Sequence, residues 1–210
     1  MNSAATLLPA EYRREISSAE LIALPIRRYE GEVALVSTPA ELERALADIG
    51  TERVVGFDTE TRPSFRKGES YPPCLAQVAT ARAVYLFQLL RQDFSHAIAQ
   101  LLGAREIVKV GISVAEDLRQ LRQLYPLDVA SVIDAGAVAR HHGLRQTGLR
   151  NLAAIFLGIR IPKGTRTSNW AAPRLSAAQV VYAATDAWAC RELYLCYERI
   201  GLVRNQALLR

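Results

Sequence analysis

The stretch VVGFDTET, residues 54–61, decides the fold class. It begins with an unalternated apolar run, which is typical of a central strand that is covered on both faces of a sheet. Asp58 and Glu60 follow within the same run, and side chains at positions i and i+2 of a strand point to the same face. The segment therefore predicts a buried strand that presents two carboxylates side by side near one edge of a sheet.

The segments around this strand predict an α/β fold. A strand at 31–38 precedes a helix at 39–49, whose start is marked by Ser37 or Thr38 followed by Pro39. Two further strands, 74–80 and 83–89, form a hairpin through a polar turn around Arg82. Helices at 94–103 and 113–125 then alternate with strands at 105–111 and 129–135. With 129–135 taken as the fifth strand, we expect a mixed five-stranded sheet flanked by helices.

The remaining segments complete the predicted organisation. Residues 1–31 form an N-terminal arm with a helical stretch near 19–23, and residues 32–210 form one domain. Polar loops are predicted at 62–73 and 163–170. The last part of the chain is helical, with a short helix ending near Arg140 and longer ones at 148–158 and 176–200.

Composition limits the class of protein. With 210 residues, 50% of them hydrophobic, the chain can bury a full core, and its net charge of +5 permits a polyanionic partner. No apolar run approaches the roughly 20 residues of a membrane span, and the N-terminus does not resemble an export signal. Cys74, Cys190 and Cys196 are odd in number and lack the paired spacing of a zinc site. We expect free thiols, a cytoplasmic location and no membrane partner.

Two more acids stand in helical segments. Asp117 lies on the side of its helix that carries the leucines, where an acid needs a partner. Tyr182 and Asp186 are four residues apart in the last helix, so both side chains face one spot. Each acid alone has a purely structural interpretation: Asp58 can accept backbone donors in a turn, Asp117 can bridge to an arginine, and Tyr182 and Asp186 can form an ordinary tertiary hydrogen bond.

The four acids together favour a metal site over those separate interpretations. Carboxylate oxygens suit hard divalent cations such as Mg²⁺ or Mn²⁺. Two such ions about 4 Å apart clamp the attacking and leaving oxygens of a phosphoryl displacement. We therefore expect two divalent cations, Mg or Mn, held by carboxylates from a central strand, a neighbouring helix and a late helix: Asp58, Glu60, Asp117 and Asp186.

Three motifs carry a resemblance to a known family. GFDTET, the segment VKVG with the following ED, and YAATDA resemble the three exonuclease motifs of the DEDD superfamily, whose members have a ribonuclease H-like fold. Tyr182 stands where a sister branch has a histidine, as in the DEDDy branch of ribonuclease D and the Werner-type exonuclease domain. The similarity covers roughly residues 32–200. The chain resembles a stand-alone bacterial-type member, since no helicase or other accessory domain fits in 210 residues.

The resemblance implies a metal-dependent 3′-5′ exonuclease that acts on DNA or RNA and releases nucleoside 5′-monophosphates, with single-stranded 3′ ends as its expected partner. It assigns Asp58, Glu60 and Asp186 to the ion that activates water. Asp58 and Asp117 would hold the ion at the leaving oxygen, so that Asp58 bridges the two. Tyr182 would orient the attacking water, because a phenol with a pKa near 10 is a poor base by itself.

Substrate contacts are expected in the two polar loops. Cations there can touch the phosphate backbone or remain solvated: Arg66, Lys67, Lys163 and Arg166. Phe65, Tyr71 and Trp170 can stack on unpaired bases, and Trp170 can instead pack between helices.

Two other functions stay open at this point. The fold can serve as a catalytically silent nucleic-acid-binding module, although the presence of all four acids and the tyrosine favours activity. It can also belong to a metal-dependent phosphodiesterase that acts on short oligonucleotides or on a nucleotide second messenger.

Overall fold

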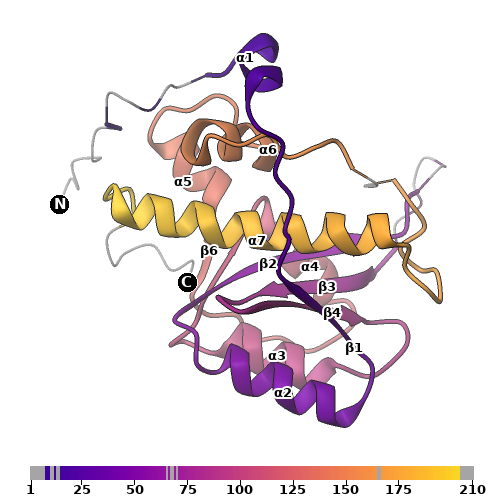
Figure 1. The fold of residues 1–210 in the computed structure, drawn as a ribbon. Helices are drawn as coiled ribbons and strands as arrows, with labels where there is room; N and C mark the ends of the chain where they lie inside the picture. The colour runs from indigo at the N-terminus through magenta and orange to yellow at the C-terminus, as the bar shows by residue number, and fades with distance from the viewer. Residues whose placement is uncertain are drawn as a thin grey trace.

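The structure is a computed structural model, and it describes residues 8, 9, 12, 15–64, 66, 69, 71–164 and 167–203. Its centre is one six-stranded sheet with the order β1-β4-β3-β2-β5-β6 (Figure 1). The β2–β3 and β3–β4 pairs are antiparallel, and the other three pairs are parallel. The strands are β1 (Glu32–Val36), β2 (Val54–Thr61), β3 (Pro73–Ala79), β4 (Ala83–Gln88), β5 (Val108–Gly111) and β6 (Val132–Asp134).

The predicted α/β class and mixed sheet are confirmed, but the sheet has six strands and not five. All six predicted strand segments join it, because β1 pairs in parallel with β4 along one edge. The predicted hairpin is also present, and the backbone N–H of Thr80 donates to the carbonyl of Ala83 at 2.9 Å to close its turn.

Helices cover both faces of the sheet. Figure 1 shows α7 lying across one face and α2 and α3 on the opposite face. None of the helices in the described part of the chain is both long and apolar enough to cross a membrane. The helices are α1 (Ser18–Ala23), α2 (Pro39–Ile49), α3 (Ser95–Gly103), α4 (Val114–Leu121), α5 (Ala135–His141), α6 (Leu149–Leu152) and α7 (Ala177–Arg199), with a π-helix η1 (Ala153–Leu157) after α6.

Local sequence signals set the starts of α2 and α7. The hydroxyl of Thr38 accepts from the backbone N–H of Glu41, whose carboxylate accepts from the N–H of Thr38, and Pro39 opens the helix. Ser176 and Gln179 form the same reciprocal cap at α7. These caps satisfy backbone donors that a helix start leaves unpaired.

Two helix predictions need correction. The helix predicted at 113–125 ends at Leu121, and hydrogen-bonded turns follow up to Tyr125. Pro126 limits the helical segment on this side, because a proline disfavours helical backbone in the residue before it, here Tyr125. The helix predicted at 148–158 divides into α6 and the π turn η1, since the N–H of Gly158 donates to the carbonyl of Ala153, five residues back.

A close approach of helix and strand positions the later site. Gly56, in the middle of VVGFDTET, lies under α7, and a Cβ atom at this position would come within 1.8 Å of the carbonyl oxygen of Ala187. Only glycine leaves room for such contact between backbones. This contact brings the α7 residues beside Ala187 close to the strand residues that follow Gly56.

The segment between α1 and β1, residues 24–31, lies on the same side of the sheet as α7. Figure 1 shows it passing across α7 on its way to β1. The backbone of Arg160 accepts from Arg27 at 3.1 Å and donates to Pro25 at 2.8 Å. Further along, the N–H of Tyr29 donates to the hydroxyl of Thr185 in α7 at 3.0 Å. The segment is thus attached to the helix that carries Asp186, the acid of the sequence motif YAATDA.

Candidate active site

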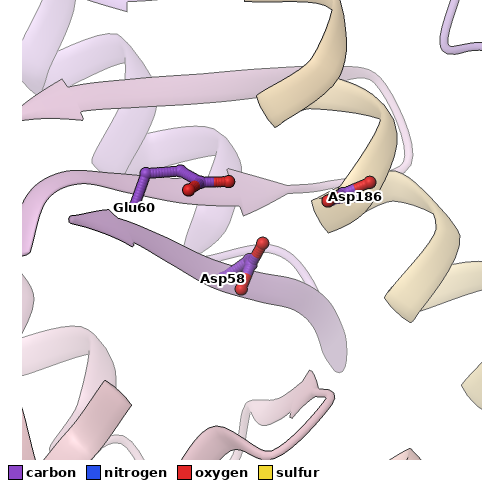
Figure 2. Close-up of side chains that lie close together, drawn as sticks. All are labelled: Asp58, Glu60 and Asp186. Atoms are coloured by element: carbon purple, nitrogen blue, oxygen red, sulfur yellow. The ribbon is translucent and has the colours of Figure 1, made fainter. Parts of the chain in front are cut away.

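Three carboxylates meet between β2 and α7. Asp58 and Glu60 extend from β2 and Asp186 extends from α7, and each offers an oxygen within 4.8 Å of the other two (Figure 2). Glu60 and Asp186 are buried, with 7% and 8% of their surface exposed, whereas Asp58 is half-buried. Three acids this close, two of them buried, form a donor set that fits a hard divalent cation.

The fourth predicted acid, Asp117, is held at the edge of this cluster. It lies in the first turn of α4, and its Oδ1 accepts a hydrogen bond of 2.5 Å from the hydroxyl of Thr59. Its hydrogen-bond donor is thus a threonine and not an arginine. The neighbouring Glu116 is exposed and pairs with Arg119 along α4. Asp117 lies close enough to Asp58 for its charge to act on that carboxyl.

The acids strongly disfavour ionising together. Burial raises the pKa of Asp117 to about 6 and that of Asp186 to about 6. Burial also raises the pKa of Asp58 well above its usual range, and the charges of Asp117, Asp186 and Glu60 add to this effect. Crowded buried carboxylates have this property because each charge loses water and meets like charges. A bound cation would remove the repulsion.

Tyr182 is bound to the cluster as a hydrogen-bond donor. It lies one helical turn before Asp186 and donates to that carboxylate. Burial, followed by the charges of Asp186 and Glu60, raises the pKa of the Tyr182 phenol above its ordinary value. The phenol therefore stays protonated at physiological pH, which argues against a role as general base.

Two neighbours fix the ring of Tyr182. The indole of Trp170 lies 5.9 Å away between ring centroids, and Trp170 is only 1% exposed. Trp170 is therefore buried, which favours the alternative that it packs between helices over stacking on bases. Gly164 also lies so close that a Cβ atom there would come within 1.8 Å of a Tyr182 ring carbon. The loop before α7 thus holds the phenol in place.

Three polar residues near the acids were missed by sequence reasoning. Arg150 donates from Nε to the carbonyl of Ile161 at 2.8 Å, and its charge lowers the pKa of Asp186. Asp134 caps α5 by accepting from the N–H of Ala137 at 3.0 Å, and its charge raises the pKa of Asp117. The third, Thr59, stands between the two acids of β2. The alternation of side chains along a strand could have indicated Thr59, because it places this side chain on the face opposite to Asp58, toward the predicted helix of Asp117.

The structure places few of the predicted substrate contacts. Arg66 and Lys163 are exposed in the loops after β2 and before α7. Phe65, Lys67 and Arg166 lie outside the described residues. The guanidinium of Arg62 lies 4.7 Å from the ring centroid of Tyr71, so Arg62 covers that ring. A cavity of about 440 Å³ opens between these loops, lined by Arg62, Pro63, Thr167, Asn169 and Ala171.

Comparison with known proteins decides the family. A family model described as 3′-5′ exonuclease matches residues 33–197, most of the chain. The chain belongs to this 3′-5′ exonuclease family. The matched range includes β2, α4 and α7, and hence all four acids and Tyr182.

One curated relative agrees with this assignment, and two solved structures share the fold. The ribonuclease D of Gluconacetobacter diazotrophicus is 33% identical over 171 residues, which cover 79% of this chain but only 42% of that protein. The solved EXO domain of Aedes aegypti Nibbler has a TM-score of 0.73 at 23% identity and covers 85% of this chain and 92% of that one. A Trypanosoma brucei RNase D in complex with RNA U12 has a TM-score of 0.69 at 18% identity, with coverages of 92% and 68%. These structures confirm the predicted ribonuclease H-like fold.

Proposed function

We propose that the chain is a metal-dependent 3′-5′ exonuclease that hydrolyses the phosphodiester bond at the 3′ end of DNA or RNA and releases nucleoside 5′-monophosphates. The observation that carries the proposal is the meeting of Asp58, Glu60 and Asp186, with oxygens within 4.8 Å of one another. Membership of the 3′-5′ exonuclease family supports the same reaction. Because the chain spans less than half of the related ribonuclease D, the activity is proposed for the present chain alone.

The donor set fits two divalent cations, Mg²⁺ or Mn²⁺. It consists of carboxylate oxygens, and burial raises the pKa values of Asp58, Asp117 and Asp186, with the charges of neighbouring acids adding to the effect at Asp58. Bound divalent cations supply an activated water and stabilise the leaving oxygen in phosphoryl transfer. Asp58, Glu60 and Asp186 would hold one ion. Asp58 and Asp117 would hold the other, with the Thr59 hydroxyl fixing the orientation of Asp117.

Tyr182 is proposed to position the nucleophile. Its phenol stays protonated, so it can donate to or orient a water but does not remove a proton at neutral pH. The hydrogen bond to Asp186 and the packing of Gly164 and Trp170 limit the positions that the phenolic oxygen can take. Such restriction of a group beside the reacting atoms is a recognised source of catalysis.

The proposed partner is a nucleic acid with an unpaired 3′ end. The net charge of +5 suits a polyanion, and Arg66 and Lys163 are exposed in the two loops beside the acids. We keep Phe65, Lys67 and Arg166 as proposed contacts in the same loops. One related structure, the Trypanosoma brucei RNase D, contains RNA, which favours including RNA among the substrates to be tested.

We also propose the arm and location that the sequence predicts. Residues 1–31 would be an arm of a domain at 32–210, and its bonds to Arg160 and Thr185 support a role in bracing α7. The free, buried thiols of Cys74, Cys190 and Cys196 are compatible with a reducing cytoplasm.

The test is product analysis on 5′-labelled single-stranded DNA and RNA of equal sequence, with Mg²⁺, with Mn²⁺ and with EDTA. We expect a ladder that shortens stepwise from the 3′ end, requires metal and is absent in Asp58→Ala. Asp128→Ala is the matched control, since it removes an exposed carboxylate at a distance from the acid cluster.

The possible outcomes separate the proposed function from its alternatives. Intact substrate with every metal, together with measurable binding, would identify a silent nucleic-acid-binding module. Cleavage confined to the shortest members of a length series would identify an oligonucleotide phosphodiesterase. Full activity in Asp58→Ala would overturn the site assignment.

A further inference from the structure

Gln77 is a polar residue in an apolar part of the sheet. It occupies the centre of β3, where none of its surface is exposed. On the same face of β3, its neighbours two residues away are Leu75 and Ala79, both buried in an apolar cluster. Within the part of the chain that the structure describes, neither Nε2 nor Oε1 of Gln77 has a hydrogen-bond partner. An unsatisfied buried polar group destabilises a fold by about 1–3 kcal/mol, so this amide calls for an explanation.

The strand register places this amide beside the acid cluster. Gln77 stands directly opposite Asp58 in the antiparallel pair of β2 and β3. Directly opposed residues point to the same face, with Cβ atoms about 4.5–5.5 Å apart. The next strand presents Leu86 opposite Gln77, so Asp58 is the polar member of this cross-strand row. A glutamine side chain is long enough to reach a carboxylate at that spacing.

Small residues of α7 pack over this face of the sheet. The α7 residues that pack over this face, Ala183, Ala184 and Ala187, are fully buried and belong to the same cluster as Leu75 and Ala79. Alanines have no polar side-chain atoms and offer Gln77 no partner. Of the two residues that stand directly opposite Gln77 on the neighbouring strands, Asp58 and Leu86, only Asp58 is polar.

The hydrogen-bonding capacities of Gln77 and Asp58 are complementary. A carboxylate only accepts hydrogen bonds, and a carboxamide nitrogen donates two. A hydrogen bond from the backbone of Thr59 stabilises the ionised form of Asp58, but burial and the charges of three neighbouring acids disfavour that form. When cations fill the site and Asp58 is fully ionised, a second hydrogen-bond donor would stabilise and orient its carboxylate. Groups that bind and orient metal ligands in this way typically change metal affinity by 10- to 100-fold.

We infer that Gln77 is a positioning residue whose carboxamide Nε2–H donates a hydrogen bond to the ionised carboxylate of Asp58 and orients it in the metal-loaded site. The inference rests on the proposed function, because it requires Asp58 to be a metal ligand. Gln77 touches neither the substrate nor the reacting atoms in this role. This role explains why a glutamine, and not an apolar residue, lies between Leu75 and Ala79 on this face of β3.

The test compares Gln77→Met with Gln88→Met. Methionine keeps the length of the side chain and removes the amide. Gln88 is the matched control, since it lies in the neighbouring strand β4, and its amide donates to the carbonyl of Ala172 at 3.3 Å. We expect Gln77→Met to keep or raise the Tm of the metal-free protein, because an unsatisfied amide is lost. We expect its Kd for Mn²⁺, measured by calorimetry, to rise about 10- to 100-fold, whereas Gln88→Met binds Mn²⁺ like the wild type.

A second measurement needs no variant and covers the case in which Gln77→Met does not fold. The two side-chain amide protons of Gln77 are followed by NMR in the wild-type protein while Mg²⁺ is added. We expect one of them to move downfield and to exchange more slowly with water, as a proton donated to a carboxylate does.

The outcomes distinguish the inference from the proposed function. If the wild type binds no Mn²⁺ and degrades no substrate, the proposed function itself is wrong. If the wild type binds Mn²⁺ and Gln77→Met binds it equally well, or if the amide protons do not respond to Mg²⁺, the positioning role of Gln77 is wrong and the exonuclease assignment stands. A loss of Tm in Gln77→Met without any loss of Mn²⁺ affinity would show a purely structural residue.

Discussion

The hydroxyl of Thr59 binds Asp117, while the residues on either side of Thr59 turn their carboxylates toward Asp186. The three consecutive residues Asp58, Thr59 and Glu60 therefore serve the site from both faces of one strand. Alternation along a strand explains how this is possible, since Thr59 points opposite to its neighbours. The strand thereby links the acid of α4 to the acids of β2 and α7.

Removal of this link should weaken the site without unfolding the protein. Thr59→Val keeps the shape of the side chain and removes its hydroxyl, so Asp117 loses its donor. We expect the affinity for Mn²⁺ and the kcat to fall about 10- to 100-fold each. Calorimetry with Mn²⁺ and single-strand degradation assays measure the two effects. The matched control is Thr61→Val, two residues further along the same strand, which should retain wild-type kcat; an equal loss in both variants would contradict the role of Thr59.

Tyr182→Phe separates positioning of the nucleophile from metal binding. The variant keeps the ring against Trp170 and removes the hydroxyl that donates to Asp186. We expect kcat to fall about 10- to 100-fold, in line with the loss of a hydrogen bond to a charged group, with a much smaller change in Mn²⁺ affinity. In the wild type, the raised pKa of Tyr182 means that ionisation of this phenol does not shape the pH profile of kcat below pH 10. A profile that tracks a phenol ionising near pH 8 would contradict this assignment.

Gly164→Ala should act on catalysis through Tyr182. The new methyl group would come within 1.8 Å of a ring carbon, so either the ring or the loop must move. We expect a loss of kcat comparable to that of Tyr182→Phe, and the double variant should be no worse than either single one, since both act through one side chain. Gly148→Ala is the control, because a Cβ atom there meets nothing within 4 Å. Additive losses in the double variant would show that Gly164 acts elsewhere.

The sequence predicted those parts of the structure that depend on local chemistry. The capped start of α2 and the buried run of β2 follow from side chains near in sequence, and both are present. The meeting of Asp58 and Asp186 was predicted from the set of four acids as a metal site, and from the resemblance of the motifs to a family with a known site. Periodicity alone brings only residues of one helix or strand together.

Tertiary contacts account for what the sequence did not predict. Arg150 lies near Asp186 only because α6 and η1 pack beside α7, and the π turn of η1 has no signal in the spacing of apolar residues. In the sequence, Gly56 is one residue of a strand and Gly164 one residue of a polar loop, and neither is marked as special. In the fold, Gly56 permits close contact with the backbone of Ala187, and Gly164 permits close contact with the ring of Tyr182. The edge pairing of β1 with β4 depends likewise on a crossover and not on either strand alone.

The crowding of acids predicts how stability depends on pH and metal. The folded-state pKa of Asp186 is about 6, above its ordinary 3.8, so the folded state holds more protons than the unfolded chain between these values. Stability of the metal-free protein should therefore fall as pH rises from about 4 to 6. At pH 7.5 we expect metal-free Asp58→Asn to melt about 2–8 °C above the wild type, since one repelling charge is lost. At pH 4 the difference should nearly vanish.

Metal provides the check on this prediction. Mn²⁺ should raise the Tm of the wild type at pH 7.5 much more than at pH 4, because it binds ionised carboxylates and must displace protons at low pH. Asp58→Asn should lose most of that increase, whereas Asp128→Asn, which changes an exposed carboxylate, should keep it. An equal gain with Mn²⁺ in Asp58→Asn and in the wild type would exclude Asp58 as a ligand.

Lys109 provides a second pH signature, on the opposite face of the sheet from α7. Its side chain is fully buried in β5, and Nζ donates to the carbonyl of Ala104 at the end of α3 at 2.6 Å. Burial lowers the pKa of Lys109 to about 8, from an ordinary 10.5. Between these values the unfolded chain binds the extra proton, so this group makes the protein more stable as pH rises from about 8 to 10.5.

Lys109→Met should remove that dependence. The free energy of unfolding of the wild type, measured with urea at pH 7.5, 8.5 and 9.5, should increase relative to the variant by about 1–3 kcal/mol over this range, since one pKa unit corresponds to about 1.4 kcal/mol. Ionising tyrosines affect both proteins alike and cancel in the comparison. Lys163→Met, which changes an exposed lysine, should follow the wild type. Parallel curves for the wild type and Lys109→Met would mean that Lys109 keeps its proton in the folded state, held by the carbonyl of Ala104.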